Sequence, residues 1–175
     1  MSGGALRLER YIRDVPDFPI PGILYRDITP LLASAEALGQ AVQSMSEPWR
    51  ERGVDLVASM EARGFIFGAG IALRIGAGFV PVRKAGKLPW RTREVRYSLE
   101  YGTDILHMHE DAVTAGQKVL VVDDLIATGG TASAVVELVE NLGGEVVGVQ
   151  FLIELSELRG RELLRGRDVR SVIIY

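Results

Sequence analysis

Residues 121–132 read VVDDLIATGGTA, and this stretch decides the fold. An aliphatic run ends in two adjacent acids, Asp123 and Asp124, and small residues, hydroxyls and paired glycines follow. This order predicts a buried strand, a tight loop and a helix that begins at about Thr131. Because ligands of open α/β sheets bind beyond the carboxyl ends of the strands, the stretch also predicts a binding site.

The loop after the acids has the chemistry of a site for an anion beside hydroxyl groups. Backbone N–H groups at a helix N-terminus bind anions, and the helix dipole strengthens the attraction. The hydroxyls of Thr128 and Thr131 are further donors. Ionised carboxylates only accept hydrogen bonds, which suits the two hydroxyls of a ribose. The stretch therefore fits a ribose 5-phosphate; the alternative is an acidic, solvated turn.

Strand and helix patterns alternate along the rest of the chain. Strands are expected at VDLVASM (54–60), AGFVPV (77–82), TDILHMHEDAV (103–113), QKVLVVDD (117–124), EVVGVQFLIEL (145–155) and VRSVIIY (169–175). Helices are expected at ALRLERYIRDV (5–15), ASAEALGQAVQSMSEPWRERG (33–53, with Ser34 as N-cap), RGFIFGAGIALRIG (63–76) and GTASAVVELVENLGG (130–144). Such alternation favours a single α/β domain on a mostly parallel central sheet.

One charged segment interrupts this alternation. RKAGKLPWRTREVR, residues 83–96, has no clear period and holds two of the three lysines of the chain, Lys84 and Lys87. A long loop inside a compact domain is usually functional or mobile, so a functional loop is expected here.

Composition excludes several classes of function. The 20 basic and 23 acidic residues give a net charge of −3, so no basic field indicates a nucleic-acid partner. The absence of cysteine excludes disulfides and thiolate chemistry. No apolar run reaches the roughly 18 residues of a membrane span, and the N-terminus lacks a signal-peptide centre. We expect a soluble, cytoplasmic domain without a membrane partner. His107 and His109 are expected to be structural, since no third metal ligand is evident.

VLVVDDLIATGGT, residues 119–131, resembles the ribose-phosphate signature of the type I phosphoribosyltransferases, which use 5-phosphoribosyl-1-pyrophosphate (PRPP). The resemblance implies a single domain over 1–175, with a small hood at about 1–33 and a flexible catalytic loop at about 83–96. It places Asp123 and Asp124 at the ribose hydroxyls. It implies that the 5-phosphate is bound by Ala127, Thr128, Gly129, Gly130 and Thr131. It also implies Mg²⁺, held mainly by substrate oxygens, and we assign no protein metal ligand.

Three further segments resemble the adenine-using members of that family, in their order and spacing. They are DFPIPGILYRDITPLL (17–32), EARGFIFG (61–68) and YSLEYGTD (97–104). The resemblance implies that Leu24 and Tyr25 lie beside the base, with Arg26 at its edge. It assigns pyrophosphate to Glu61, Ala62, Arg63, Arg83, Lys84 and Lys87, and Arg83 is also a candidate for the site of a neighbouring subunit. It makes Glu100 the group that handles the purine proton.

Each of these assignments has a simpler alternative. Leu24 and Tyr25 suit ordinary core packing, and Arg26 suits an ion pair with Asp27. EARG suits a helix cap, the charged segment suits a solvated loop, and Glu100 alone suits a surface position.

The resemblance implies transfer of a phosphoribosyl group from PRPP to adenine, giving AMP and pyrophosphate, by a homodimer. Family members that use 6-oxopurines carry Glu-Asp before the loop and an Asp where this chain has Ala127, which argues for adenine. Two alternatives stay open: a phosphoribosyltransferase for xanthine or orotate, and a non-catalytic PRPP-binding regulator.

Overall fold

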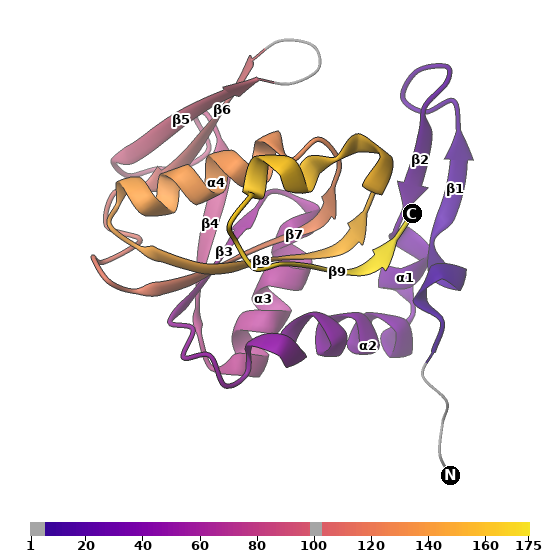
Figure 1. The fold of residues 1–175 in the computed structure, drawn as a ribbon, viewed down its shortest axis with the longest axis horizontal. Helices are drawn as coiled ribbons and strands as arrows, with labels where there is room; N and C mark the ends of the chain where they lie inside the picture. Colours follow the sequence, from indigo (N-terminus) through magenta and orange to yellow (C-terminus); the bar gives the residue numbers. More distant parts are fainter. Residues whose placement is uncertain (1–5, 99–102) are drawn as a thin grey trace. The chain divides into compact units, whose positions relative to one another are not determined.

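The computed structural model describes residues 6–98 and 103–175 (Figure 1). The chain divides into two compact units, residues 1–44 and residues 45–175. In chain order, the first elements are η1 (Leu8–Tyr11), β1 (Arg13–Pro16), β2 (Leu24–Asp27), α1 (Thr29–Ala33) and α2 (Ala35–Ser46). They are followed by η2 (Glu47–Trp49), β3 (Leu56–Met60), α3 (Arg63–Ile75), β4 (Gly78–Lys84), β5 (Thr92–Ser98) and β6 (Thr103–His109). The last are β7 (Lys118–Ile126), α4 (Gly130–Asn141), β8 (Glu145–Glu154), η3 (Ser156–Leu158), η4 (Gly160–Leu164) and β9 (Val169–Ile174).

The second unit is built on a seven-stranded sheet in the order β5-β6-β4-β3-β7-β8-β9. Neighbours from β4 to β9 are parallel, whereas β6 is antiparallel to both β4 and β5. The mostly parallel α/β sheet predicted from the sequence is therefore confirmed, with an antiparallel hairpin added at one edge.

The chain leaves the centre of this sheet in two opposite directions. From β3 it passes through α3 to β4 on one side, and from β7 it passes through α4 to β8 on the other. Because such crossovers are right-handed, the two helices cover opposite faces of the sheet, as Figure 1 shows. The order reverses between β3 and β7, and such a reversal point is where doubly wound sheets bind ligands.

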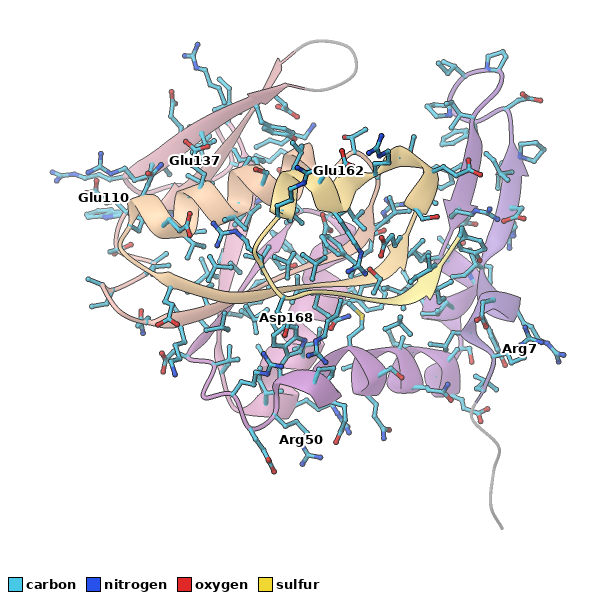
Figure 2. All side chains as sticks on the ribbon, in the orientation of Figure 1. Arg7, Arg50, Glu110, Glu137, Glu162 and Asp168 are labelled. Carbon is cyan, nitrogen blue, oxygen red and sulfur yellow. The ribbon has the colours of Figure 1, made fainter. Side chains whose placement is uncertain are left out.

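The core explains why these segments form strands and helices. The side chains from Val119 to Val122 in β7 are all buried, as expected for a strand covered on both faces. On α4 the buried side chains are Ala132, Ala134, Val135, Val136, Leu138 and Val139, which form its inner face. At the far end of the sheet Trp49 is fully buried and its Nε1–H donates to Gln150 Oε1 at 2.9 Å. Asp168, labelled in Figure 2, binds the two arginines that lie over the Trp49 ring, Arg52 and Arg170.

The first unit departs from the sequence prediction. The helix expected over residues 5–15 is wrong: only Leu8–Tyr11 is helical, and Arg13–Pro16 forms β1. This strand pairs antiparallel with β2, from Arg13 opposite Asp27 to Pro16 opposite Leu24. The partner strand lies beyond the segment whose apolar residues have a helical period, so that period did not decide the structure. Ser34 is confirmed as a cap for α2, because its Oγ accepts the Ala37 N–H at 3.2 Å.

The charged segment 83–96 is not a continuous loop. Its first two residues end β4, and Thr92 begins β5, which pairs along its length with β6. Val95 is buried and Tyr97 is partly buried against the same core, while Arg93, Glu94 and Arg96 are exposed, so two inward side chains anchor an otherwise charged edge strand. Only residues 85–91 connect the two strands. The flexibility of this region, the single-domain organisation and the hood over 1–33 stay predictions.

Candidate active site

A cavity of about 250 Å³ opens at the carboxyl ends of β3 and β7. Its lining comes from the ends of β3 and β7, the turns that follow them, the first residues of α3 and α4, and one residue of β8: Met60, Glu61, Ala62, Arg63, Asp123, Asp124, Leu125, Ile126, Ala127, Thr128, Gly129, Gly130, Thr131, Ala132 and Phe151. The structure thus brings together the predicted ribose-phosphate residues and three of the predicted pyrophosphate residues. It does so at the point where the strand order reverses.

The predicted phosphate-binding residues, 127–131, form a turn that leads into α4; we call this turn the phosphate cradle. Gly129 precedes the helix with φ +84°, a left-handed conformation that favours glycine. Its carbonyl accepts the Ser133 N–H at 2.9 Å, which closes the first helical turn. The first N–H groups of a helix have no acceptor inside the helix, so the cradle offers donors to an anion in the cavity.

The two carboxylates lie within β7, which continues two residues beyond the predicted strand, to Ile126. Asp123 Oδ1 accepts the Asp124 N–H at 2.9 Å. Asp124 is only 5% exposed, and its Oδ2 lies 2.8 Å from Arg63 Nε at the start of α3. Gly64 permits this arrangement, because a Cβ at that position would lie 2.6 Å from Asp123 Oδ1. Helix α3 therefore approaches β7 closely enough to place a guanidinium beside the acids.

The acids stand in an environment that resists their ionisation. Burial raises the pKa of Asp123 well above its ordinary value, and the negative charge of Asp124 adds to the effect. Burial also raises the pKa of Asp124, against the opposing pull of the Arg63 guanidinium. Perturbed carboxyl groups that line a cavity are typical of functional sites. A ligand with hydroxyl donors or a cation would stabilise their charged form.

The Glu61 carboxylate binds basic residues that are predicted to contact pyrophosphate. Its carboxylate is 8% exposed and accepts hydrogen bonds from Arg83 Nε at 3.1 Å and Nη2 at 2.9 Å. It also accepts the Lys84 N–H at 2.8 Å and lies 3.2 Å from Lys87 Nζ. Burial raises the pKa of Glu61, but these hydrogen bonds outweigh it and the pKa is lowered overall. The segment after β4 is thus attached to the β3–α3 loop, where the Glu61–Ala62 peptide is cis.

Lys84 is held separately from Arg83 and Lys87. Its Nζ lies 2.8 Å from Asp104 Oδ2 on β6, and that hydrogen bond raises the pKa of the lysine. Three of the four basic residues assigned to pyrophosphate, Arg83, Lys84 and Lys87, therefore lie at or just after the C-terminal end of β4, and they pair with two different carboxylates.

The three residues predicted at the base belong to the first unit. Leu24, Tyr25 and Arg26 lie on β2 in the first unit, where Tyr25 packs edge-on against Phe18 with ring centroids 5.1 Å apart. Arg26 pairs with Asp14 across the hairpin. Glu100 lies outside the described residues. The roles of these four residues at the base stay predictions.

Two residues near the cradle were given no role from the sequence. Thr131 Oγ1 donates to Tyr97 Oη at 3.5 Å, and burial raises the pKa of that tyrosine. Gly160, in the segment after β8, lies directly behind Gly129. Tyr97 belongs to the quoted motif YSLEYGTD, so its neighbourhood was a usable signal, but no local pattern marks Gly160.

One of the two histidines, His107, contacts the paired strand. His107 Nδ1 lies 2.9 Å from Thr92 Oγ1 on the paired strand β5. Within residues 6–98 and 103–175, no group of three or more His, Cys, Asp or Glu side chains is arranged to hold a metal ion. In the same residues, no helix has both the length and the apolar character needed to cross a bilayer.

Comparison with known proteins agrees with this geometry. The family described as "Phosphoribosyl transferase domain" matches residues 27–174. Together with the α/β sheet and its cradle, this match shows that the chain belongs to the phosphoribosyltransferases, with the type I fold.

Full-length relatives narrow the family further. The adenine phosphoribosyltransferase of Thermotoga maritima is 58% identical over 97% of this chain and 98% of its own length. That of Symbiobacterium thermophilum is 56% identical over 94% of this chain and 96% of its own. The crystal structure of the Thermoanaerobacter pseudethanolicus enzyme superimposes with a TM-score of 0.93 at 51% identity, covering 96% of this chain and 98% of that one. Within the phosphoribosyltransferases, the chain belongs with these adenine phosphoribosyltransferases.

Proposed function

We propose that the protein transfers the 5-phosphoribosyl group of PRPP to adenine, giving AMP and pyrophosphate. The observation that carries the proposal is the cavity that joins a carboxylate pair to an anion-binding helix start. A relative from Saccharomyces cerevisiae, 38% identical with a TM-score of 0.89, was crystallised with adenine and an imino-altritol bisphosphate. A relative from Giardia lamblia, 32% identical with a TM-score of 0.90, was crystallised with 9-deazaadenine. Ligands of this kind support a purine and a phosphorylated sugar as the substrates.

Different residues of the cavity bind different parts of PRPP. Asp123 and Asp124 accept the ribose hydroxyls, and the phosphate cradle donates to the 5-phosphate. Arg63, Arg83 and Lys87 are close enough to Glu61 and Asp124 to supply positive charge where pyrophosphate leaves. Such preorganised charge stabilises a transition state in which the C1–oxygen bond to pyrophosphate breaks as the bond to the purine nitrogen forms.

Proton handling is assigned to Glu100. The purine loses a proton as its nitrogen bonds to C1, and a carboxylate within hydrogen-bond reach accepts it. Leu24 and Tyr25 would cover the flat, apolar faces of the base, with Arg26 at its edge. Closure of the segment that carries Arg83, Lys84 and Lys87 would keep water from the ribosyl centre.

We also propose Mg²⁺ as the cofactor. Asp123 and Asp124 are hard oxygen donors of the type this ion prefers, and the buried Asp124 Oδ2 has no hydrogen bond of good geometry. Two carboxylates are too few for a complete protein site, so the ion would be held mainly by substrate oxygens, with Asp123 and Asp124 beside it. Mg²⁺ would neutralise charge on the departing pyrophosphate.

Turnover with defined bases tests this proposal directly. The protein is incubated with PRPP, Mg²⁺ and, in separate reactions, adenine, hypoxanthine, guanine, xanthine or orotate, and nucleotides are separated by chromatography. We expect AMP from adenine, little product from the other bases, and loss of activity with excess EDTA that added Mg²⁺ restores. Conversion of xanthine or orotate but not adenine would reverse the assignment of the base. Binding of PRPP with no turnover of any base would favour a regulator.

We further propose that the protein acts as a homodimer. The exposed face of α3 carries an apolar stripe of Ala62, Ile66, Ala69 and Leu73, and Leu73 is 85% exposed. The stripe begins at Ala62, a cavity-lining residue, so a second copy seated there would reach the site.

Sedimentation equilibrium tests the dimer. We expect twice the chain mass for the wild-type protein and for the control variant Leu163→Glu. Leu163 is an exposed residue of η4, outside the apolar stripe on α3. We expect the mass of one chain for Leu73→Glu, because a charge buried in an apolar interface is costly. A monomeric wild-type protein, or a dimer unaffected by Leu73→Glu, would contradict the proposed interface.

A cytoplasmic location, proposed from the cysteine-free composition, is tested by fractionating cells that express the protein.

A further inference from the structure

The phosphate cradle is supported from behind by a segment that does not line the cavity. Gly129 of the cradle lies so close to Gly160 that a Cβ on Gly129 would be 2.3 Å from the Gly160 carbonyl oxygen. Conversely, a Cβ on Gly160 would be 2.3 Å from the Ala127 carbonyl oxygen and 2.9 Å from the Gly129 nitrogen. Two backbones are therefore in direct contact, with no side chain between them.

Crowding, rather than backbone conformation, makes glycine necessary at position 160. The residue before it, Arg159, is the one in the left-handed region, with φ +54°. Gly160 begins η4 and is buried. Any side chain there would have to displace the cradle or η4.

An ion pair between the partly exposed Arg161 and the buried Glu154 fixes the segment that carries Gly160. The guanidinium of Arg161 donates to both oxygens of Glu154, at 2.6 and 2.7 Å, and to the Val169 carbonyl at 2.7 Å. Glu154 is only 7% exposed, and its Oε2 also accepts the Ser171 hydroxyl at 2.7 Å. The Arg161 hydrogen bond lowers the pKa of Glu154, so the carboxylate stays ionised.

This ion pair connects the segment that carries Gly160 to the last two strands of the sheet. Glu154 ends β8, and Val169 and Ser171 belong to the neighbouring strand β9. The Leu155 N–H donates to the Ile126 carbonyl at 3.0 Å, which joins the same segment to the residue before the cradle. Gly160 is therefore held from β8 and β9 and presses on the turn that follows β7.

We infer that Gly160, fixed by the Glu154–Arg161 ion pair, is a positioning residue that sets the geometry of the phosphate cradle. The inference rests on the proposed function, because it assigns the cradle to the 5-phosphate of PRPP. An anion site made of backbone N–H groups depends on their mutual placement within fractions of an ångström. Gly160 provides that placement without contacting the substrate.

Gly160→Ala tests the inference by a difference between the two substrates. We expect KM for PRPP to rise at least about 10-fold, and the affinity for ribose 5-phosphate measured by calorimetry to fall similarly. This corresponds to the loss of one or two charge-assisted hydrogen bonds. KM for adenine should stay within about twofold, because the base does not use the cradle. The control is Gly39→Ala, at an exposed helical glycine with open space around it, where both KM values should be unchanged.

Glu154→Gln is a second variant that keeps the shape of the side chain, in case Gly160→Ala does not fold. We expect a smaller rise in KM for PRPP with KM for adenine again unchanged. The control is Glu162→Gln on the same segment, an exposed residue that pairs with Arg159 (Figure 2). A general loss of structure would lower kcat and change both KM values instead. Folded Gly160→Ala and Glu154→Gln proteins with a wild-type KM for PRPP would overturn the inference.

The binding measurement separates this inference from the proposed function. Absence of adenine turnover in the wild-type protein would reject the function. Ribose 5-phosphate would still report on the cradle in that case. Wild-type turnover with no effect of the substitutions would reject only the positioning role.

Discussion

Asparagine in place of Asp123 (Asp123→Asn) is expected to lower kcat/KM for PRPP by about 100-fold and to raise the stability of the free protein. The amide keeps the shape of the carboxylate and can still accept the Asp124 N–H. It loses the charge and one of the two acceptors that would bind the ribose hydroxyls. Two hydrogen bonds to a charged group, together about 3 kcal/mol, correspond to about that factor.

The gain in stability follows from the raised pKa of Asp123, which is caused by burial and by the charge of Asp124. A carboxyl group whose pKa is raised by folding binds its proton more tightly in the folded than in the unfolded state. The free energy of unfolding therefore falls as pH rises from the ordinary aspartate range towards the raised pKa. In Asp123→Asn the free energy of unfolding does not fall in this way. The variant is therefore more stable than the wild-type protein at neutral pH but not in acid. Each 1 kcal/mol gained would raise Tm by roughly 2–4 °C.

Steady-state kinetics with PRPP and urea unfolding at several pH values measure the two effects. Asp111→Asn, at an exposed acid between β6 and β7, is the control and should change neither quantity. An unchanged kcat/KM in Asp123→Asn would remove that residue from the ribose site. A loss of stability at neutral pH would show that the charged carboxylate is instead stabilised by its surroundings.

Glu100→Gln is expected to lower kcat by about 100-fold or more and to leave the affinity for PRPP almost unchanged. Glutamine has nearly the same size and can hydrogen-bond to a purine, but it cannot accept the proton that the purine loses. General-base catalysis of this kind typically contributes about 10²–10⁴ in rate. Kinetics with saturating adenine would measure kcat, and calorimetry with PRPP would measure affinity. The acid limb of the wild-type pH–rate profile should also flatten in the variant.

Glu94→Gln provides the matched control for Glu100→Gln. Glu94 is an exposed acid on β5, the strand that precedes Glu100 in the chain, so kcat should stay at the wild-type value. Wild-type kcat in Glu100→Gln would exclude the proton role. A large fall in PRPP affinity would indicate that Glu100 contributes to binding of the sugar phosphate rather than to proton transfer.

The central elements of the fold were predictable because their patterns are local and strong. The aliphatic run before Asp123 is typical of a buried strand, and the glycines after it suit the turn into α4. The same holds for β3 and α3, whose small residues allow close packing: a Cβ on Gly68 would lie 2.6 Å from Ser59 Cβ. The β3–α3 and β7–α4 pairs supply most of the residues that line the cavity. The ribose-phosphate site was therefore predictable together with these elements.

The edges of the structure were not predictable in the same way. Arg13–Pro16 and Thr92–Ser98 have few buried side chains, and they become strands only because a partner strand completes their backbone hydrogen bonds. The attachment of Arg83 and Lys87 to Glu61 joins residues more than 20 positions apart. Contacts over such separations leave no periodic signal in either segment.

By itself the sequence determined the chemistry of this protein: adjacent carboxylates, a run of small residues suited to backbone N–H donation, and arginine and lysine in the charged segment 83–96. Hydropathy and glycine placement also determined which segments enter the parallel sheet. Only the tertiary structure decided how those groups meet. The reversal of strand order brings the loops after β3 and β7 to one cavity, and Gly160 reaches the cradle from 30 residues away. The reason is physical: residue type sets what a group can bind, whereas distance and burial, which set how strongly it binds, arise from the packing of distant segments.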